Sequence, residues 1–236
     1  MEEGLLRKRL KNWLIGLGID PVDLKIYIES MTHRSFAKEI NVKSRGNEQL
    51  EFLGDSILSF IITSYLYKNF SYYNEGRLAK VRSLLVSGKT LASISKAIKI
   101  DKYILLSENE EFSEGRNKES ILADAFEAFI GAIYIDKGIN FTTQWFLDKF
   151  EDIIEEKANS PKISDYKTYL QEIIQADYCQ LVKYKLIKSV GPDHDKMFYS
   201  IALLNNKTIG QGRGKSKKDS EQEAARNALK SLYNLT

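Results

Sequence analysis

The chain has 236 residues, of which 43% are hydrophobic, and carries a formal net charge of +3 at pH 7. This length fits one large domain or two ordinary ones with packed cores, and no apolar run approaches the roughly 20 residues of a transmembrane helix. With one Cys, two His and no signal-peptide pattern, the composition excludes an internal disulfide, argues against zinc and Cys-His catalysis, and predicts a cytoplasmic protein.

The first 150 residues predict an all-α domain. Apolar residues recur there with a helical period, and no convincing strand interrupts them. The stretches with this period are residues 22–30, 48–68, 77–86, 91–97, 120–136 and 142–156.

Clustered carboxylates mark one face of the second of these helices. Glu48, Glu51 and Asp55 fall within about 60° of one another, because a helix turns about 100° per residue. The opposite face is predicted to be buried and consists of Leu50, Leu53, Ile57, Phe60 and Ile61. Phe52 lies near the acids, which predicts an exposed aromatic ring that needs a partner surface. Gly54 interrupts the helix, which predicts a close approach of another backbone.

The helix predicted at 120–136 repeats this arrangement with Asp124 and Glu127. Its opposite, buried face is predicted to consist of Leu122, Phe126, Phe129 and Ile133. The small residues Ala123, Ala128 and Gly131 would let a second helix approach closely.

The two carboxylate clusters predict a site for a hard cation. Like charges three or four positions apart destabilise a helix by a few tenths of a kcal/mol, and no Lys or Arg is interleaved to offset them. Oxygen ligands of this kind select Mg²⁺ or Mn²⁺. The alternative interpretation is that both clusters are solvated acidic faces.

A polar stretch at residues 155–162, which contains one of only three prolines, predicts a domain boundary. We expect one domain at residues 1–157 and a second at 162–236. Residues 161–236 contain 13 Lys and Arg but 8 Asp and Glu, whereas the preceding residues carry a slight acidic excess. This asymmetry favours a polyanion-binding module joined to an acidic, metal-loading module.

The C-terminal part predicts the order α-β-β-β-α. The expected elements are a helix at 165–177, strands at 182–186, 198–204 and 207–212, and a helix at 217–233. Asn205-Asn206 would form a tight turn between the last two strands. The inward residues are predicted to be Leu170, Ile173 and Ile174, then Ala224, Ala225, Ala228, Leu229 and Leu232. Cys179 is interpreted as a small buried residue. The glycine-rich stretch 210–218 is typical of a phosphate-binding loop before a helix, although its spacing is not that of a P-loop.

Two segments resemble the signature motifs of the ribonuclease III family. They are the stretch Asn47–Ser56, which reads Asn-Glu-Gln-Leu-Glu-Phe-Leu-Gly-Asp-Ser, and the stretch Arg116–Ala128. The C-terminal part resembles a double-stranded RNA-binding domain in the segments 165–172, 191–194 and 220–225. The resemblance implies an endoribonuclease for double-stranded RNA, with Mg²⁺ that Mn²⁺ could replace, 5′-phosphate and 3′-hydroxyl products, short 3′ overhangs and a role in ribosomal RNA processing.

The resemblance also implies roles for single residues in the N-terminal part. Glu51, Asp55, Asp124 and Glu127 would ligate metal, and Glu48 would act at the edge of the site; Glu48, Asp55 and Glu127 are the expected catalytic residues. Phe52 would pack into the other subunit of a homodimer. Glu75 would help form the RNA-binding surface or the second site across the dimer. His33, in Thr32–Ser35, is interpreted as structural.

In the C-terminal part the resemblance implies three RNA contacts. The first helix would present Thr168, Gln171 and Glu172 to one minor groove, and His194 would reach the next. Phosphates between them would be bridged by Lys215, Lys217 and Lys218. Two alternatives are a non-catalytic RNA-binding protein and a nuclease of small structured RNAs without an accessory domain. The intact carboxylate set argues against the first, and residues 161–236 against the second.

Overall fold

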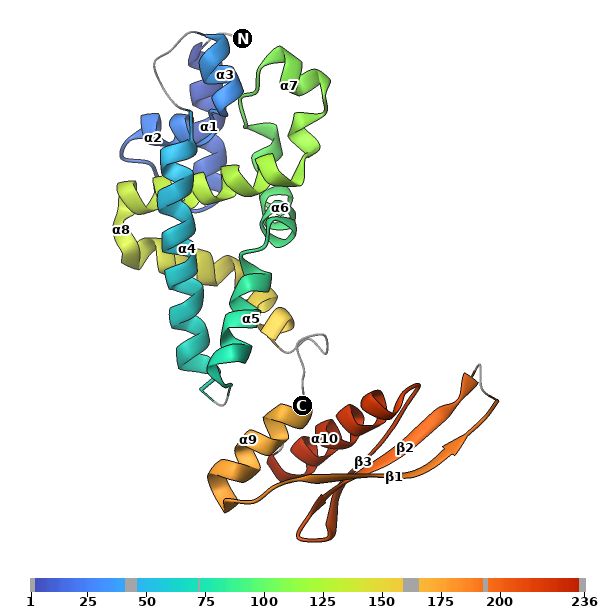
Figure 1. Cartoon of the computed structure of the whole chain (residues 1–236). Helices are drawn as coiled ribbons and strands as arrows, with labels where there is room; N and C mark the ends of the chain where they lie inside the picture. The colour runs from blue at the N-terminus through green and yellow to red at the C-terminus, as the bar shows by residue number, and fades with distance from the viewer. Residues whose placement is uncertain (1–2, 41–45, 72, 159–165, 193–194, 234–236) are drawn as a thin grey trace. The chain divides into compact units, whose positions relative to one another are not determined.

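The computed structural model divides the chain into two compact units, Met1–Asn159 and Ser160–Thr236. It describes all residues except 1–2, 41–45, 72, 159–165, 193–194 and 234–236 (Figure 1). Most of the predicted boundary stretch lies outside the described residues, so the boundaries at 157 and 162 stay a prediction.

The first unit is helical, as predicted. Its helices are α1 (Glu3–Gly16), α2 (Leu24–Ser30), α3 (Arg34–Glu39), α4 (Glu48–Asn69), α5 (Glu75–Leu85), α6 (Gly88–Ala97), α7 (Glu108–Phe112) and α8 (Glu119–Ala158), with short 3₁₀ helices η1 (Ile100–Lys102) and η2 (Gly115–Asn117). The predicted stretches correspond to α2, α4, α5, α6 and the two parts of α8. Helices α1, α3 and α7 are additional to them.

α8 consists of two helical segments that meet at Gly138. Its φ of 76° and ψ of 172° belong to a region that essentially only glycine occupies. The hydroxyl of Thr142, one turn into the second segment, donates to the Gly138 carbonyl at 2.9 Å. The chain therefore turns sharply, and the second segment runs back beneath α4 in Figure 1.

The core of this unit forms where α4 packs along α8. The predicted buried face of the first part of α8 is confirmed, because Leu122, Phe126, Phe129 and Ile133 are almost completely buried. The prediction for α4 was wrong at Phe60, which is 58% exposed. The buried face of α4 follows Gly54, Leu58, Ile61 and residues beyond them, and lies closer to the acidic stripe than predicted. Glu51 is therefore half-buried at the helix contact.

The second unit has the predicted α-β-β-β-α order. Its elements are α9 (Tyr166–Tyr178), β1 (Lys183–Val190), β2 (Met197–Leu204), β3 (Lys207–Gly214) and α10 (Lys217–Tyr233). The strands form an antiparallel sheet in the order β1-β2-β3. Asn205 and Asn206 have φ values of 50° and 63°, as a tight hairpin turn with two left-handed residues requires.

One core joins both helices of this unit to the sheet, and Figure 1 shows α9 and α10 on the same side of the strands. Leu170 and Ile174 are buried with Ala202, Ala224 and Ala228, as the helical period predicts. Leu232 was predicted inward but is 45% exposed, because it lies in the last turn of α10, beyond the end of the packed face.

Two further interpretations in this unit were wrong. Cys179 is exposed. It directly follows the last residue of α9 with a φ of 53°, so the helix ends there and the side chain lies outside the core.

The stretch 210–214 belongs to strand β3 rather than to a loop. A Cβ on Gly210 or Gly212 would overlap the backbone of Ala224, so these glycines serve the contact between β3 and α10.

Candidate metal centre

The N-terminal end of α4 is anchored by Asn47. Its side chain is buried and forms no cap for α4; instead its amide donates to the carbonyl of Ser30 at 3.3 Å. This bond ties the start of α4 to the end of α2. The position of the first acidic residues is thus fixed by a polar contact with another helix.

Two glycines bring the acidic parts of α4 and α8 into backbone contact. A Cβ on Gly54 would overlap the carbonyl oxygen of Glu127, and a Cβ on Gly131 would overlap the carbonyl oxygen of Leu50. The close approach predicted for Gly54 is confirmed. Because any side chain would push the helices apart, glycine at both positions holds the two acidic segments together.

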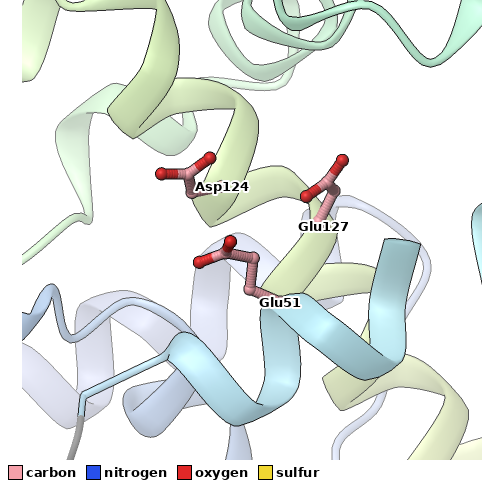
Figure 2. A group of neighbouring side chains, drawn as sticks. All are labelled: Glu51, Asp124 and Glu127. Atoms are coloured by element: carbon pink, nitrogen blue, oxygen red, sulfur yellow. The ribbon is translucent and has the colours of Figure 1, made fainter. Parts of the chain in front are cut away.

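Glu51, Asp124 and Glu127 converge between these helices. One carboxylate oxygen from each lies within 4.8 Å of the others, and all three side chains are half-buried. Figure 2 shows Glu51 on α4 facing Asp124 and Glu127 on α8. Hard divalent cations bind carboxylate oxygens at about 2.0–2.6 Å, so small side-chain rotations would let one ion contact both helices. The residues present therefore fit a divalent metal.

The electrostatics of the cluster support the same conclusion. Burial, followed by the charges of Asp55, Asp124 and Glu51, raises the pKa of Glu127 to about 7. Burial and the charges of Asp124 and Glu48 also raise the pKa of Glu51, and burial raises that of Asp124. The raised pKa values mean that the three carboxyl groups are hard to ionise at the same time. A cation placed among them would stabilise their ionised forms.

The remaining predicted acids lie outside this three-residue cluster. Asp55 is exposed one turn further along α4, where its charge acts on Glu127. Glu48 is exposed and pairs with Arg34 at 3.4 Å. Glu75 lies in the first turn of α5 and lines a separate cavity of about 400 Å³ beside Tyr67 and Arg82.

His33 caps helix α3. Its Nδ1 accepts from the backbone N–H of Ser35 at 3.2 Å, which leaves the proton of the neutral ring on Nε2. Burial lowers the pKa of His33 and favours this neutral form. The side chain also lines a cavity beside Glu51 and Asp124.

Arg34 lines the same cavity, and no role was predicted for it from the sequence. Its position directly after His33, within the stretch Thr32–Ser35, was the signal that could have indicated one. The sequence pattern does not specify that the fold places this guanidinium beside Glu48, 14 residues away.

The predicted RNA contacts of the second unit occupy different environments. Thr168 is exposed on α9, and Glu172 is half-buried. Gln171 uses its amide within the unit: Oε1 accepts from Val182 N at 2.8 Å, and Nε2 donates to Gln180 O at 3.0 Å. His194 lies outside the described residues.

The predicted phosphate-contacting lysines are exposed around the start of α10. They are Lys215, Lys217 and Lys218. Ser216 caps this helix, because its hydroxyl oxygen accepts from the backbone N–H of Asp219 at 3.1 Å. The lysines thus surround a helix end whose orientation is fixed by its cap.

Comparison with known proteins finds the same two-part organisation. A family model described as Ribonuclease-III-like matches residues 23–153, and one described as Double-stranded RNA binding motif matches residues 166–232. The ribonuclease 3 of Borreliella burgdorferi is 43% identical over 229 residues, which cover 97% of this chain and 94% of that protein. The ribonuclease 3 of Clostridium perfringens is 42% identical and is covered over 91% of its length, with 92% of this chain aligned.

A solved structure resembles the first unit. It is the nuclease domain of ribonuclease III from Campylobacter jejuni, with a TM-score of 0.55 at 35% identity. The match covers 64% of this chain and 98% of that domain. That structure is described as flexible in a region involved in dimer formation.

Proposed function

Because the chain belongs to the ribonuclease III family and is an endoribonuclease of double-stranded RNA, we propose that Glu51, Asp55, Asp124 and Glu127 form its metal-dependent cleavage site. The observation that carries the assignment is the convergence of Glu51, Asp124 and Glu127 within 4.8 Å. Mg²⁺ is the proposed ion, because oxygen-only ligation favours it, and Mn²⁺ should replace it.

The proposed mechanism needs no histidine base. A bound divalent ion would supply a water of lowered pKa and would stabilise the negative charge that develops on the phosphoryl oxygens and on the departing 3′-oxygen. Glu127 and Asp124 would hold the ion from α8, and Glu51 and Asp55 would hold it from α4. Water, rather than the 2′-hydroxyl, attacks the phosphorus, and the bond from phosphorus to the 3′-oxygen breaks. The 3′-oxygen takes up a proton as it leaves, so the products are a 5′-phosphate and a 3′-hydroxyl end.

Glu48 is proposed to act at the edge of the site. It is exposed and paired with Arg34, which suits contact with the substrate rather than inner metal ligation. Glu75 lies in the first turn of α5 and lines another cavity; we propose that it contributes to the RNA surface or to the second site of a dimer.

The second unit is proposed to anchor the duplex by its shape. Thr168, Gln171 and Glu172 would contact one minor groove, and His194 would reach the next groove. For this contact Gln171 would give up its exposed 3.5 Å hydrogen bond to Gln175. The exposed lysines at the start of α10, Lys215, Lys217 and Lys218, would bridge the intervening phosphates. The basic excess of residues 161–236 supports this division of labour.

A homodimer through the first unit is proposed to supply two cutting sites. The Phe52 ring is 79% exposed on α4, next to the acidic residues, and a second copy would bury it. A two-fold pair of sites matches the two strands of a duplex and would yield short 3′ overhangs. The Campylobacter nuclease domain, with its region involved in dimer formation, supports this proposal.

Precursors of ribosomal RNA and other structured transcripts are the proposed substrates, and the cytoplasm is the proposed location. Among the described residues, no helix is long and apolar enough to cross a membrane. The proposal is tested by incubating long duplex RNA with Mg²⁺, with Mn²⁺ or with EDTA, and determining the chemistry of the product ends. Cleavage in EDTA, or 2′,3′-cyclic phosphate ends, would contradict it.

A further inference from the structure

A cavity of about 490 Å³ opens beside the carboxylate cluster, and its walls carry opposite charges. Its acidic lining residues are Glu48, Glu51, Asp124 and Glu110, and its cationic ones are Arg34, Lys38 and Lys118. His33, the N-cap of α3, lines it as well. A cavity with this lining suits a group that is anionic and lies next to a bound cation.

Arg34 is the cation of this cavity that pairs with an acid of α4. It lines the cavity together with Glu51 and Asp124, and its guanidinium reaches the carboxylate of Glu48. Its ion pair with Glu48 spans 3.4 Å, and the two side chains are 62% and 44% exposed. An exposed pair at this distance contributes little to stability, so Arg34 can exchange Glu48 for a stronger anion.

The other cations of the cavity are less suited to this exchange. Lys118 is already held by Glu110 at 2.5 Å and by Ser113 at 3.1 Å. Lys38 also lines the cavity, but its ammonium is a flexible point charge. Arginine, in contrast, presents a planar fork of donors that matches two phosphate oxygens.

We propose that Arg34 binds a non-scissile backbone phosphate of the RNA strand being cut, and so places the neighbouring phosphodiester at the carboxylate cluster. In the free protein Glu48 holds the guanidinium over the cavity, and the substrate phosphate takes its place. This inference rests on the proposed cleavage site and adds a substrate-binding residue to it. It also gives Glu48 a role that does not require metal ligation.

The proposal is tested in the full-length protein with duplex RNAs that carry a single neutral methylphosphonate at successive positions around the cut. The unsubstituted protein is assayed with Mg²⁺ in single turnover. A methylphosphonate at one non-scissile position should lower its cleavage rate by roughly 10- to 100-fold, the range of a lost charge-assisted hydrogen bond. Arg34→Ala should lower the rate on unmodified RNA by a similar factor and should be insensitive to the modification at that same position.

Arg34→Lys should keep part of the rate and part of this sensitivity, because it retains the charge without the fork. Lys11→Ala, which removes an exposed cation from α1 outside the cavity, is the control and should behave as the unsubstituted protein does. In EDTA, where no cleavage interferes, Arg34→Ala should flatten the dependence of log affinity on log salt by about 0.9, the value for one phosphate contact.

Free inorganic phosphate distinguishes a general anion site from one that recognises RNA. If millimolar phosphate inhibits the unsubstituted protein but not Arg34→Ala, the cavity binds free phosphate as well. Such inhibition overturns the assignment to the RNA backbone when Arg34→Ala is not insensitive to the methylphosphonate at any single position. Equal sensitivity of Arg34→Ala and the unsubstituted protein at every position would also overturn it. Failure of the unsubstituted protein to cut with Mg²⁺ would instead overturn the proposed function.

Discussion

Gly54 of α4 lies directly against the backbone of Glu127 in α8, so closely that a Cβ at position 54 would overlap the Glu127 carbonyl oxygen. The contact joins a residue of the first acidic helix to a proposed metal ligand of the second. It makes the spacing of the carboxylates a consequence of backbone packing, since the two helices can meet this closely only where a side chain is missing.

Gly54→Ala should therefore separate α4 from α8. We expect a loss of about 1–3 kcal/mol in the free energy of unfolding, as for other overpacked contacts, and a loss of cleavage because Glu127 moves away from Glu51. Urea or thermal unfolding and a cleavage assay measure the two effects. Gly76→Ala is the control, because the nearest atom to a Cβ there is 3.7 Å away and alanine suits a helix. An equally stable, active Gly54→Ala protein would contradict the packing argument.

The raised pKa of Glu127, about 7, predicts how the stability of the metal-free protein depends on pH. Between the ordinary carboxyl value near 4.5 and 7, the folded state binds more protons than the unfolded state. The contribution of protonated Glu127 to the free energy of unfolding is thus fully present below about pH 4.5 and is lost as the pH rises through 7.

Glu127→Gln should remove this dependence and stabilise the metal-free protein at pH 8 by on the order of 1 kcal/mol, a value reduced for solvent screening at a half-exposed group. Thermal unfolding in EDTA at pH 5 and pH 8 measures it. Added Mg²⁺ should stabilise the unsubstituted protein at pH 8 more than at pH 5, because binding requires ionised carboxylates. A substituted protein that is destabilised at pH 8 would contradict the assignment of the shift.

Phe52→Ala should weaken the proposed dimer. Burying a phenylalanine stabilises an interface by roughly 1.5–3 kcal/mol, and two-fold symmetry counts the ring twice, so the dissociation constant should rise about 100-fold or more. Sedimentation at micromolar concentration measures the change. Phe112→Ala provides a matched control, since that ring is 93% exposed at the end of α7. A monomeric unsubstituted protein would refute the dimer.

A truncated protein that ends at Asn159 should keep the helical fold and the carboxylate cluster, because both lie within the first compact unit. It should lose most of its affinity for duplex RNA at about 0.15 M salt, and lower salt or Mn²⁺ should restore some cutting. The double substitution Lys217→Ala, Lys218→Ala should reproduce part of this loss uniformly across duplex sequences. Full affinity in the truncated protein would show that the second unit is not the main anchor.

Periodicity predicted most of the fold, because helical and strand patterns are local properties of the sequence. The helix predicted at 217–233 has the same bounds in the structure, and the buried face around Phe126 and Phe129 is confirmed. Phe60 shows the limit: which side of α4 is buried depends on where α8 crosses it, and Gly54 draws that crossing toward the acids. A single helix does not contain this information.

The candidate site was predictable only in part for the same reason. Spacing predicted that Glu51 lies with the acids of α4, and the small residues around Glu127 predicted a close helix neighbour. The pairing of Arg34 with Glu48 depends on where the fold places α3 relative to the start of α4, which the sequence pattern does not specify. The exposure of Cys179 likewise follows from the left-handed residue that ends α9 and not from its residue type.

If the acidic cluster performs the cleavage, removing one of its charges should abolish cutting without weakening RNA binding. The most direct test compares Glu127→Gln with the unsubstituted protein on long duplex RNA, in single turnover with Mg²⁺, while affinity is measured separately in EDTA. Glu119→Gln, an exposed acid in the first turn of the same helix, is the control. We expect Glu127→Gln to lower the cleavage rate by at least about 100-fold and to leave RNA affinity unchanged, while Glu119→Gln cleaves at the unsubstituted rate. Cleavage by Glu127→Gln at the unsubstituted rate at low Mg²⁺ would contradict it.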